Sequence, residues 1–164
     1  MVSMAENFKE FYAAHKARLF GYLMRLTGDY ENSRDIMQES FTRYFERYTG
    51  NPFSPALLFT IARNAVLDDL RRKRPQDPLD DQLCSPGATD QERHMLVRDE
   101  YRRVLTAMQQ LSIDERDLLC LVISGGLAYR EIARMTGLSV ANLKVKIHRI
   151  RLKLRELLKM GEMK

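Results

Sequence analysis

The chain has 164 residues, of which 45% are hydrophobic and 30% charged, a balance typical of a folded globular protein rather than a disordered one. No apolar run approaches the roughly 20 residues that span a bilayer, and the N-terminal residues lack the layout of a signal peptide, so we expect a cytoplasmic protein. The net charge of +5 is uneven: residues 1–74 carry 12 basic and 9 acidic side chains, residues 75–100 carry 2 and 7, and residues 101–164 carry 13 and 6. Two basic segments around an acidic one predict two surfaces for a polyanion.

The first segment has a helical pattern, because its apolar residues recur at spacings of three and four. Gly28 with Asp29, and then the run Gly50-Asn51-Pro52, interrupt this pattern and mark turns. Three helices are therefore predicted, at about 4–27, 30–48 and 55–74.

The acidic segment has the composition of a flexible linker. The stretch RPQDPLDDQLCSPGATD, residues 74–90, contains three prolines, one glycine and four aspartates. We expect an N-terminal domain over residues 1–74, an acidic Pro-rich linker over 75–90 and a C-terminal domain over 91–164.

The C-terminal domain is also predicted to be helical. Asp90 can cap a helix that runs to about Gln110. Ser112 and Glu115 match a capping box for a second helix, which should end at Gly125-Gly126. Since no segment alternates long enough for a strand, the fold class is predicted to be all-α, in two small helical domains.

The last residues have the layout of a helix-turn-helix. A short helix at 128–135 and a turn containing Gly137 precede a longer helix, for which Ser139 is the expected N-cap. One side of the longer helix is an apolar stripe that should face the core: Val140, Leu143, Ile147, Ile150, Leu154 and Leu157. The other side presents Ala141, Asn142, Val145, His148 and Arg149, with Lys144 at its edge. In a helix-turn-helix the second helix enters the major groove of DNA.

The basic character of this helix has two explanations. Lys144 to Arg155 contains six basic side chains and no acidic one, and such a run taken alone is explained by a solvated surface. Because the short helix, the Gly137 turn and the apolar stripe accompany it, we interpret it as a DNA-binding surface.

Catalysis is not expected, because the sequence contains no nucleophile with a matching base and no phosphate-binding loop. Asp77, Asp80 and Asp81 lie in a Pro-rich stretch without the preorganised geometry of a metal site. Cys84 and Cys120 have no metal-binding or redox spacing, so we expect reduced thiols. We predict no catalytic residue, no metal and no cofactor.

Three stretches resemble a known family, and they occur in that family's order. RDIMQESFTRYFERY (34–48), LLFTIARNAVLDDLRRKR (57–74) and AYREIARMTGLSVANLKVKIHRIRLKLREL (128–157) are similar to parts of bacterial RNA polymerase sigma factors of the extracytoplasmic-function (ECF) group of the sigma-70 family. The resemblance covers nearly the whole chain. It implies a subunit that binds core RNA polymerase and directs promoter-specific transcription initiation.

The resemblance assigns the first stretch to the polymerase clamp. Asp35, Gln38 and Glu39 lie along one side of the predicted helix, and a basic partner surface would suit them. The alternative for these residues is an ordinary solvated acidic patch.

The second stretch resembles the helix that reads the minus-ten promoter element and holds the separated strand. The loop before it corresponds to the one that captures a flipped base, although a plain connecting turn is the alternative. The residues implied to contact the minus-ten element are Asn51, Phe53, Ser54, Arg63, Asn64, Asp68, Arg71, Arg72 and Arg74. Those that lie in the helix should be more exposed to solvent than the apolar side of the helix.

The third stretch resembles the domain that reads the minus-thirty-five element. The implied contact residues are Tyr129, Arg130, Asn142, Lys144, Val145, Lys146, His148 and Arg149. The resemblance further implies contacts with the clamp and flap regions of core polymerase, a linker that runs toward the RNA path, and an anti-sigma factor as partner.

Several positions depart from the family pattern. Phe45 and Leu57 stand where the family often has Trp, and Ala128 stands where Ser or Thr usually caps the short helix. Ala141 and Val145 replace the usual Gly and Ser, so a different base preference is expected. The alternative function is a free-standing helix-turn-helix regulator that does not bind core polymerase.

Overall fold

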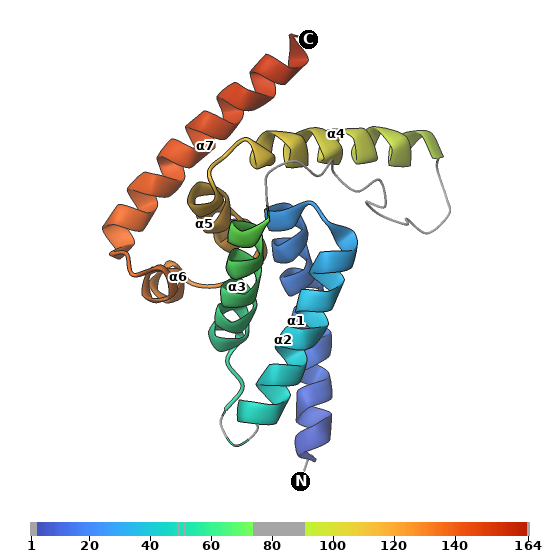
Figure 1. Cartoon of the computed structure of the whole chain (residues 1–164), viewed down its shortest axis with the longest axis vertical. Coiled ribbons are helices and arrows are strands. Elements are labelled where there is room, and N and C mark those ends of the chain that lie inside the picture. The colour runs from blue at the N-terminus through green and yellow to red at the C-terminus, as the bar shows by residue number, and fades with distance from the viewer. Residues whose placement is uncertain (1–2, 49, 51, 74–90, 164) are drawn as a thin grey trace.

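The structure is a computed structural model that describes residues 3–48, 50, 52–73 and 91–163, and for residues 91–97 only the backbone (Figure 1). The described residues form seven helices and no strand, which confirms the all-α prediction. The predicted linker, 75–90, lies outside the described residues. In the described part of the chain, no helix has both the length and the apolar character needed to cross a membrane.

Three helices precede the linker: α1 (Met4–Thr27), α2 (Tyr30–Tyr48) and α3 (Pro55–Arg72). The capping box of Ser3 and Glu6 begins α1, and the Ser54 hydroxyl accepts a bond from the Leu57 amide at the start of α3. Helix α2 packs against both others, and Tyr22, Tyr44 and Phe59, one from each helix, are fully buried.

Four helices follow the linker: α4 (Gln91–Gln109), α5 (Ile113–Ser124), α6 (Tyr129–Thr136) and α7 (Val140–Glu162). The predicted capping box of Ser112 and Glu115 begins α5. Gly137 has φ +71°, a left-handed conformation that favours glycine, and it turns the chain between α6 and α7. The Ser139 hydroxyl then accepts a bond from the Asn142 amide at 3.1 Å, as predicted for the N-cap.

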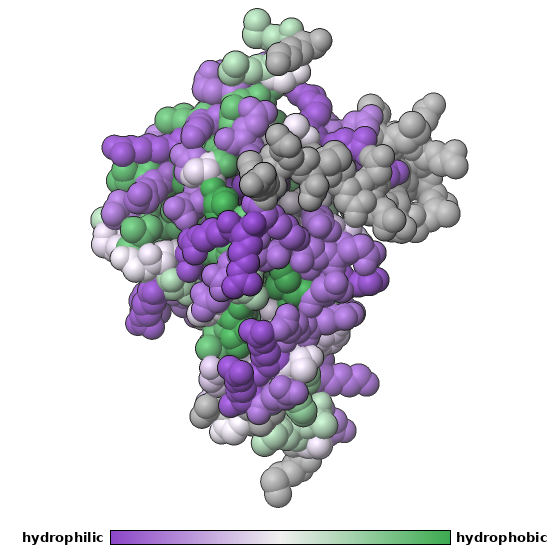
Figure 2. All heavy atoms as spheres, in the orientation of Figure 1, coloured by the Kyte–Doolittle hydropathy of each residue, from purple (hydrophilic) through white to green (hydrophobic). Residues whose placement is uncertain are grey.

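The helices on the two sides of the linker pack against each other. Helix α1 contacts α5 and α4, and α3 contacts α6 (Figure 1). One apolar cluster continues across this junction and includes Phe59 and Leu23 from the first part and Leu119 and Ile132 from the second. On the face in Figure 2, hydrophilic side chains cover most of the surface around smaller apolar areas. A packed junction between the two parts was not anticipated from the sequence.

Candidate polymerase- and DNA-binding surfaces

Helix α2 presents the predicted clamp-binding residues to solvent. Asp35, Gln38 and Glu39 are all exposed, and Glu39 forms an exposed ion pair with Arg43 one turn later. The opposite side of the helix is buried through Ser33, Ile36, Ser40, Phe41 and Tyr44. The amphipathic division of α2 therefore leaves these polar side chains available to another molecule.

Aromatic side chains gather at the end of the α1–α2–α3 unit that carries the α2–α3 connection. Phe53 stacks on Phe11 with ring centroids 5.0 Å apart. Phe8 lies 4.6 Å from Phe45 between ring centroids, and the Phe45 side chain is 42% exposed although it is large and apolar. Exposed apolar surface beside the polar face of α2 is suited to contact with a second protein.

The α2–α3 connection holds two predicted minus-ten residues that already have partners inside the fold. The Phe53 ring is half-buried, and the Ser54 amide donates to the Tyr44 hydroxyl at 2.7 Å. Asn51 lies outside the described residues. Base stacking by Phe53 would therefore compete with its stacking on Phe11.

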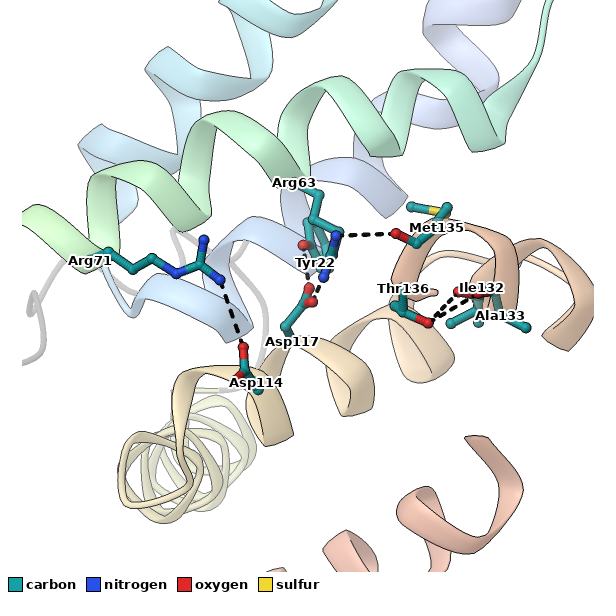
Figure 3. A network of polar contacts seen from close by, with 9 residues as sticks. All are labelled: Tyr22, Arg63, Arg71, Asp114, Asp117, Ile132, Ala133, Met135 and Thr136. Atoms are coloured by element: carbon teal, nitrogen blue, oxygen red, sulfur yellow. Dashed lines mark hydrogen bonds and ion pairs between the residues drawn. The ribbon is translucent and has the colours of Figure 1, made fainter. Parts of the chain in front are cut away.

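Helix α3 exposes most of its predicted DNA-binding side chains. Asn64, Asp68, Arg71 and Arg72 are exposed, while Leu58, Phe59, Ala62, Val66 and Leu67 form the buried side. Arg71 lies 3.8 Å from the Asp114 carboxylate in a largely exposed pair (Figure 3). Arg74 lies outside the described residues.

Arg63 differs from the expectation that it would be one of the exposed side chains of this helix. Its side chain is 19% exposed, its Nε donates to Asp117 at 2.7 Å, and its Nη1 donates to the Met135 carbonyl at 3.3 Å (Figure 3). The reason is tertiary, because α5 and α6 pack beside this part of α3 and the periodicity of one helix does not record its neighbours.

Asp117 is the centre of a buried polar network that sequence reasoning missed. Its side chain is 1% exposed, and it accepts a second bond, at 2.7 Å, from the Tyr22 hydroxyl of α1. Burial raises the pKa of Asp117, although Arg63 and Tyr22 oppose that rise. Burial and the neighbouring Asp117 raise the pKa of Tyr22 well above its usual value. The available signal was a charged residue in the apolar run of α5, DLLCLVIS.

Helices α6 and α7 present the predicted minus-thirty-five surface. Leu143, Ile147 and Ile150 are buried, and Val140, Leu154 and Leu157 are partly buried, as the apolar stripe predicted. Tyr129 is half-buried, and the other predicted contact residues are exposed: Arg130, Asn142, Lys144, Val145, Lys146, His148 and Arg149. The Val145 side chain is 49% exposed in the middle of this polar surface.

The start of α6 lacks the usual hydroxyl cap. Ala128 occupies the N-cap position with φ −67° and ψ 147°, and its side chain offers no acceptor. Glu131 instead accepts a bond from the Ala128 amide at 2.9 Å. One half of a capping box therefore supports this helix.

The sequence also raised the questions of a metal site and of the two cysteines. In the described part of the chain, no group of three or more His, Cys, Asp or Glu side chains could hold a metal ion. Cys120 is a free, fully buried thiol whose pKa is raised by that burial, which makes it a poor nucleophile. Cys84 lies outside the described residues.

Comparisons with known proteins identify the class of this chain. Residues 11–76 match the family model for sigma-70 region 2, and residues 101–154 match the model for sigma-70 region 4. The chain is 32% identical over 160 residues to the RNA polymerase sigma factor CarQ of Myxococcus xanthus, covering 93% of this chain and 90% of CarQ. It is 28% identical over 156 residues to the ECF RNA polymerase sigma factor SigM of Bacillus subtilis, covering 93% and 95% of the two chains.

Solved structures share the fold. The sigma factor RpoE from Bartonella quintana, crystallised with the anti-sigma factor NepR, superposes with a TM-score of 0.72 at 20% identity, over 94% of this chain and 98% of that one. CnrH in complex with the cytosolic domain of CnrY superposes with a TM-score of 0.70 at 24% identity, over 95% and 90%. The chain belongs to the sigma-70 family of RNA polymerase sigma factors, in its extracytoplasmic-function group.

Proposed function

We propose that this protein binds core RNA polymerase and directs promoter-specific transcription initiation. The observation that carries the proposal is the presence of both family regions in one chain, each with an exposed polar surface on a buried apolar scaffold. A free-standing regulator needs the helix-turn-helix but has no need of region 2.

Residues 1–74 form the proposed polymerase-binding and minus-ten domain. Asp35, Gln38 and Glu39 contact the clamp, and the exposed Phe45 adds apolar contact beside them. The α2–α3 connection and the exposed side of α3 hold the separated strand, because amide and guanidinium groups bind bases and phosphates. Residues 75–90 connect this domain to the second.

Residues 91–164 form the proposed minus-thirty-five domain, which also contacts the flap. Helix α7 enters the major groove with its N-terminal half, where Asn142, Val145 and Arg149 are placed to meet base edges. Lys144 and Lys146 are placed to meet phosphates. The positive balance of residues 101–164 supports this assignment, since phosphate contacts supply much of the affinity for DNA.

An anti-sigma factor is the proposed protein partner. The solved structures of RpoE with NepR and of CnrH with CnrY support this proposal through the shared fold. The cytoplasm is the proposed site of action, because core polymerase and promoter DNA are there.

Reconstitution with core polymerase tests the proposal. Purified protein mixed with core enzyme should co-elute with it in gel filtration. The complex should initiate transcription from promoters at which core enzyme alone does not initiate. A protein that stays separate from core polymerase, and binds a specific duplex tightly by itself, would instead be a free-standing regulator.

A further inference from the structure

Arg116, near the start of α5, is a buried cation with acidic neighbours in the sequence and no acidic partner. It is 6% exposed. Within the described part of the chain it forms no ion pair. The three acidic residues around it each pair with a different cation: Asp114 with Arg71, Glu115 with Lys153 and Asp117 with Arg63. The guanidinium of Arg116 therefore carries an unneutralised positive charge inside the protein.

The hydrogen-bond partners of this guanidinium are two neutral oxygens. Its Nη1 donates to the Leu26 carbonyl at 2.9 Å and to the side-chain oxygen of Gln109. Leu26 lies in the last turn of α1, where a helix carries about half an elementary negative charge. Arg116 lies in the first turn of α5, which carries a similar positive charge. The two helix ends therefore do not neutralise the guanidinium.

Burial does not remove this charge. Loss of hydration lowers the pKa of Arg116, but an arginine side chain keeps its proton in proteins. Cys120, one turn later on α5, cannot supply a negative charge because burial raises the pKa of its thiol. The cation is thus permanent, and its neutralisation has to come from another group.

Two donors beside the Arg116–Gln109 hydrogen bond have no acceptor. Arg116 Nε and Gln109 Nε2 are both buried, and neither bonds to any atom in the part of the chain that the structure describes. Nε belongs to the same guanidinium as Nη1, and Nε2 belongs to the same amide as the oxygen that Nη1 binds. The two donors therefore lie close together, and buried donors of this kind normally have a partner.

An anion meets the requirements of this place better than a water molecule does. Water could accept both hydrogen bonds, but it would leave the positive charge uncompensated, and its own hydrogens would need further acceptors. A small anion accepts both bonds and neutralises the guanidinium, and hydrogen bonds between charged groups are the stronger kind.

We propose that Arg116 Nε and Gln109 Nε2 bind a small monovalent inorganic anion, such as chloride, at the corner where α4 ends and α5 begins. The bound anion neutralises Arg116 and stabilises this corner against the end of α1. The site lies apart from the surfaces of the proposed function and does not depend on them.

Thermal unfolding of the full-length protein tests the site. Circular dichroism is followed at constant ionic strength while sodium gluconate, whose anion is too large for a site between packed helices, is replaced stepwise by sodium chloride. The melting temperature should rise with chloride and then saturate, because a ligand that binds only the folded state stabilises it. At a chloride concentration about five times the dissociation constant, the rise should be about 2–4 °C.

Gln109→Glu removes the need for the anion. The new carboxylate is next to the guanidinium and can accept bonds from both Nη1 and Nε. This variant should melt at a higher temperature than the wild type in gluconate, and chloride should no longer stabilise it. The matched control is Gln110→Glu, which makes the same change in net charge at the exposed neighbouring position. The control should keep the chloride dependence of the wild type.

Bromide locates the site directly. Crystals of the wild type grown in sodium bromide should show an anomalous scattering peak within hydrogen-bond distance of Arg116 Nε and Gln109 Nε2. If Gln109→Glu fails to fold, the chloride titration and this peak decide the question. A melting temperature that is independent of chloride, a chloride effect that persists in folded Gln109→Glu, or bromide found at the surface as an adventitious ion only, overturns the proposal.

Discussion

At the scale of the residue, Val145 is the side chain that we expect to influence base preference most directly. It is a 49% exposed apolar side chain among exposed polar neighbours on α7, and it takes no part in the apolar core of its own domain. A methyl group there can contact a thymine methyl in the major groove. We expect Val145→Ser to shift the preference at one minus-thirty-five position by about 1 kcal/mol. Transcription in vitro across a library randomised in that element measures the shift, and an unchanged preference would falsify the contact.

Lys144 is adjacent in sequence but has a different expected role. It is exposed at the edge of the apolar stripe, and in the proposed function its ammonium group contacts a phosphate. Lys144→Ala should lower transcription from strong and weak promoters alike, since a lost phosphate contact is nearly independent of sequence. The salt dependence of promoter binding by the holoenzyme should fall by about one ion. A changed base preference with unchanged salt dependence would assign Lys144 to base reading instead.

At the scale of the element, α2 divides into a buried side and an exposed polar side that carries Asp35 and Glu39. We expect the double variant Asp35→Lys with Glu39→Lys to lose most of its affinity for core polymerase, because like charges would then face the basic surface that we propose for the clamp. Gel filtration with core enzyme measures the loss, and circular dichroism should remain near that of the wild type because both residues are exposed.

The control for this variant lies on another helix. Asp99 and Glu100 of α4 are exposed, and replacing both with Lys makes the same change in net charge. This control should retain core binding. Equal losses in the two double variants would show that net charge, and not the α2 surface, determines the affinity.

The start of α6 offers a second test at this scale. Ala128 has the backbone conformation of an N-cap but no acceptor, whereas Ser112 caps α5 with its hydroxyl. Ala128→Ser should stabilise the protein by about 0.5–1 kcal/mol, and Ser112→Ala should destabilise it by about 1 kcal/mol. Urea unfolding measures both changes in the free energy of unfolding. A neutral or destabilising Ala128→Ser would show that the hydrogen bond from the Ala128 amide to Glu131 already stabilises the N-terminus of α6 enough.

At the scale of the whole molecule, the proposed function divides DNA binding between two surfaces. Each proposed surface is small and largely electrostatic, so the isolated protein should bind duplex promoter DNA weakly and gain specificity only within the holoenzyme. Electrophoretic mobility shifts at physiological salt, with free protein and with holoenzyme, compare the two directly. A tight, sequence-specific complex of the free protein would contradict this division.

The sequence by itself determined the local structure and most of the exposed faces. Periodicity, Gly28, the Ser112–Glu115 box and the Ser139 cap placed the predicted helix ends within about two residues, because these signals act between residues close in the chain. No end was predicted for α7. The apolar stripe of α7 was correct for the same reason, and it put Lys144 and Val145 on the exposed side.

Only the tertiary structure decided how the two halves meet. Arg63 has the spacing of an exposed residue on α3, yet it is bound to Asp117, which lies 54 positions later in the chain. Asp117 is likewise buried by its contacts with α1 and α3 and not by the pattern of α5. The periodicity of a helix records which side is apolar, whereas the partner of a polar side chain depends on which distant helix packs against it.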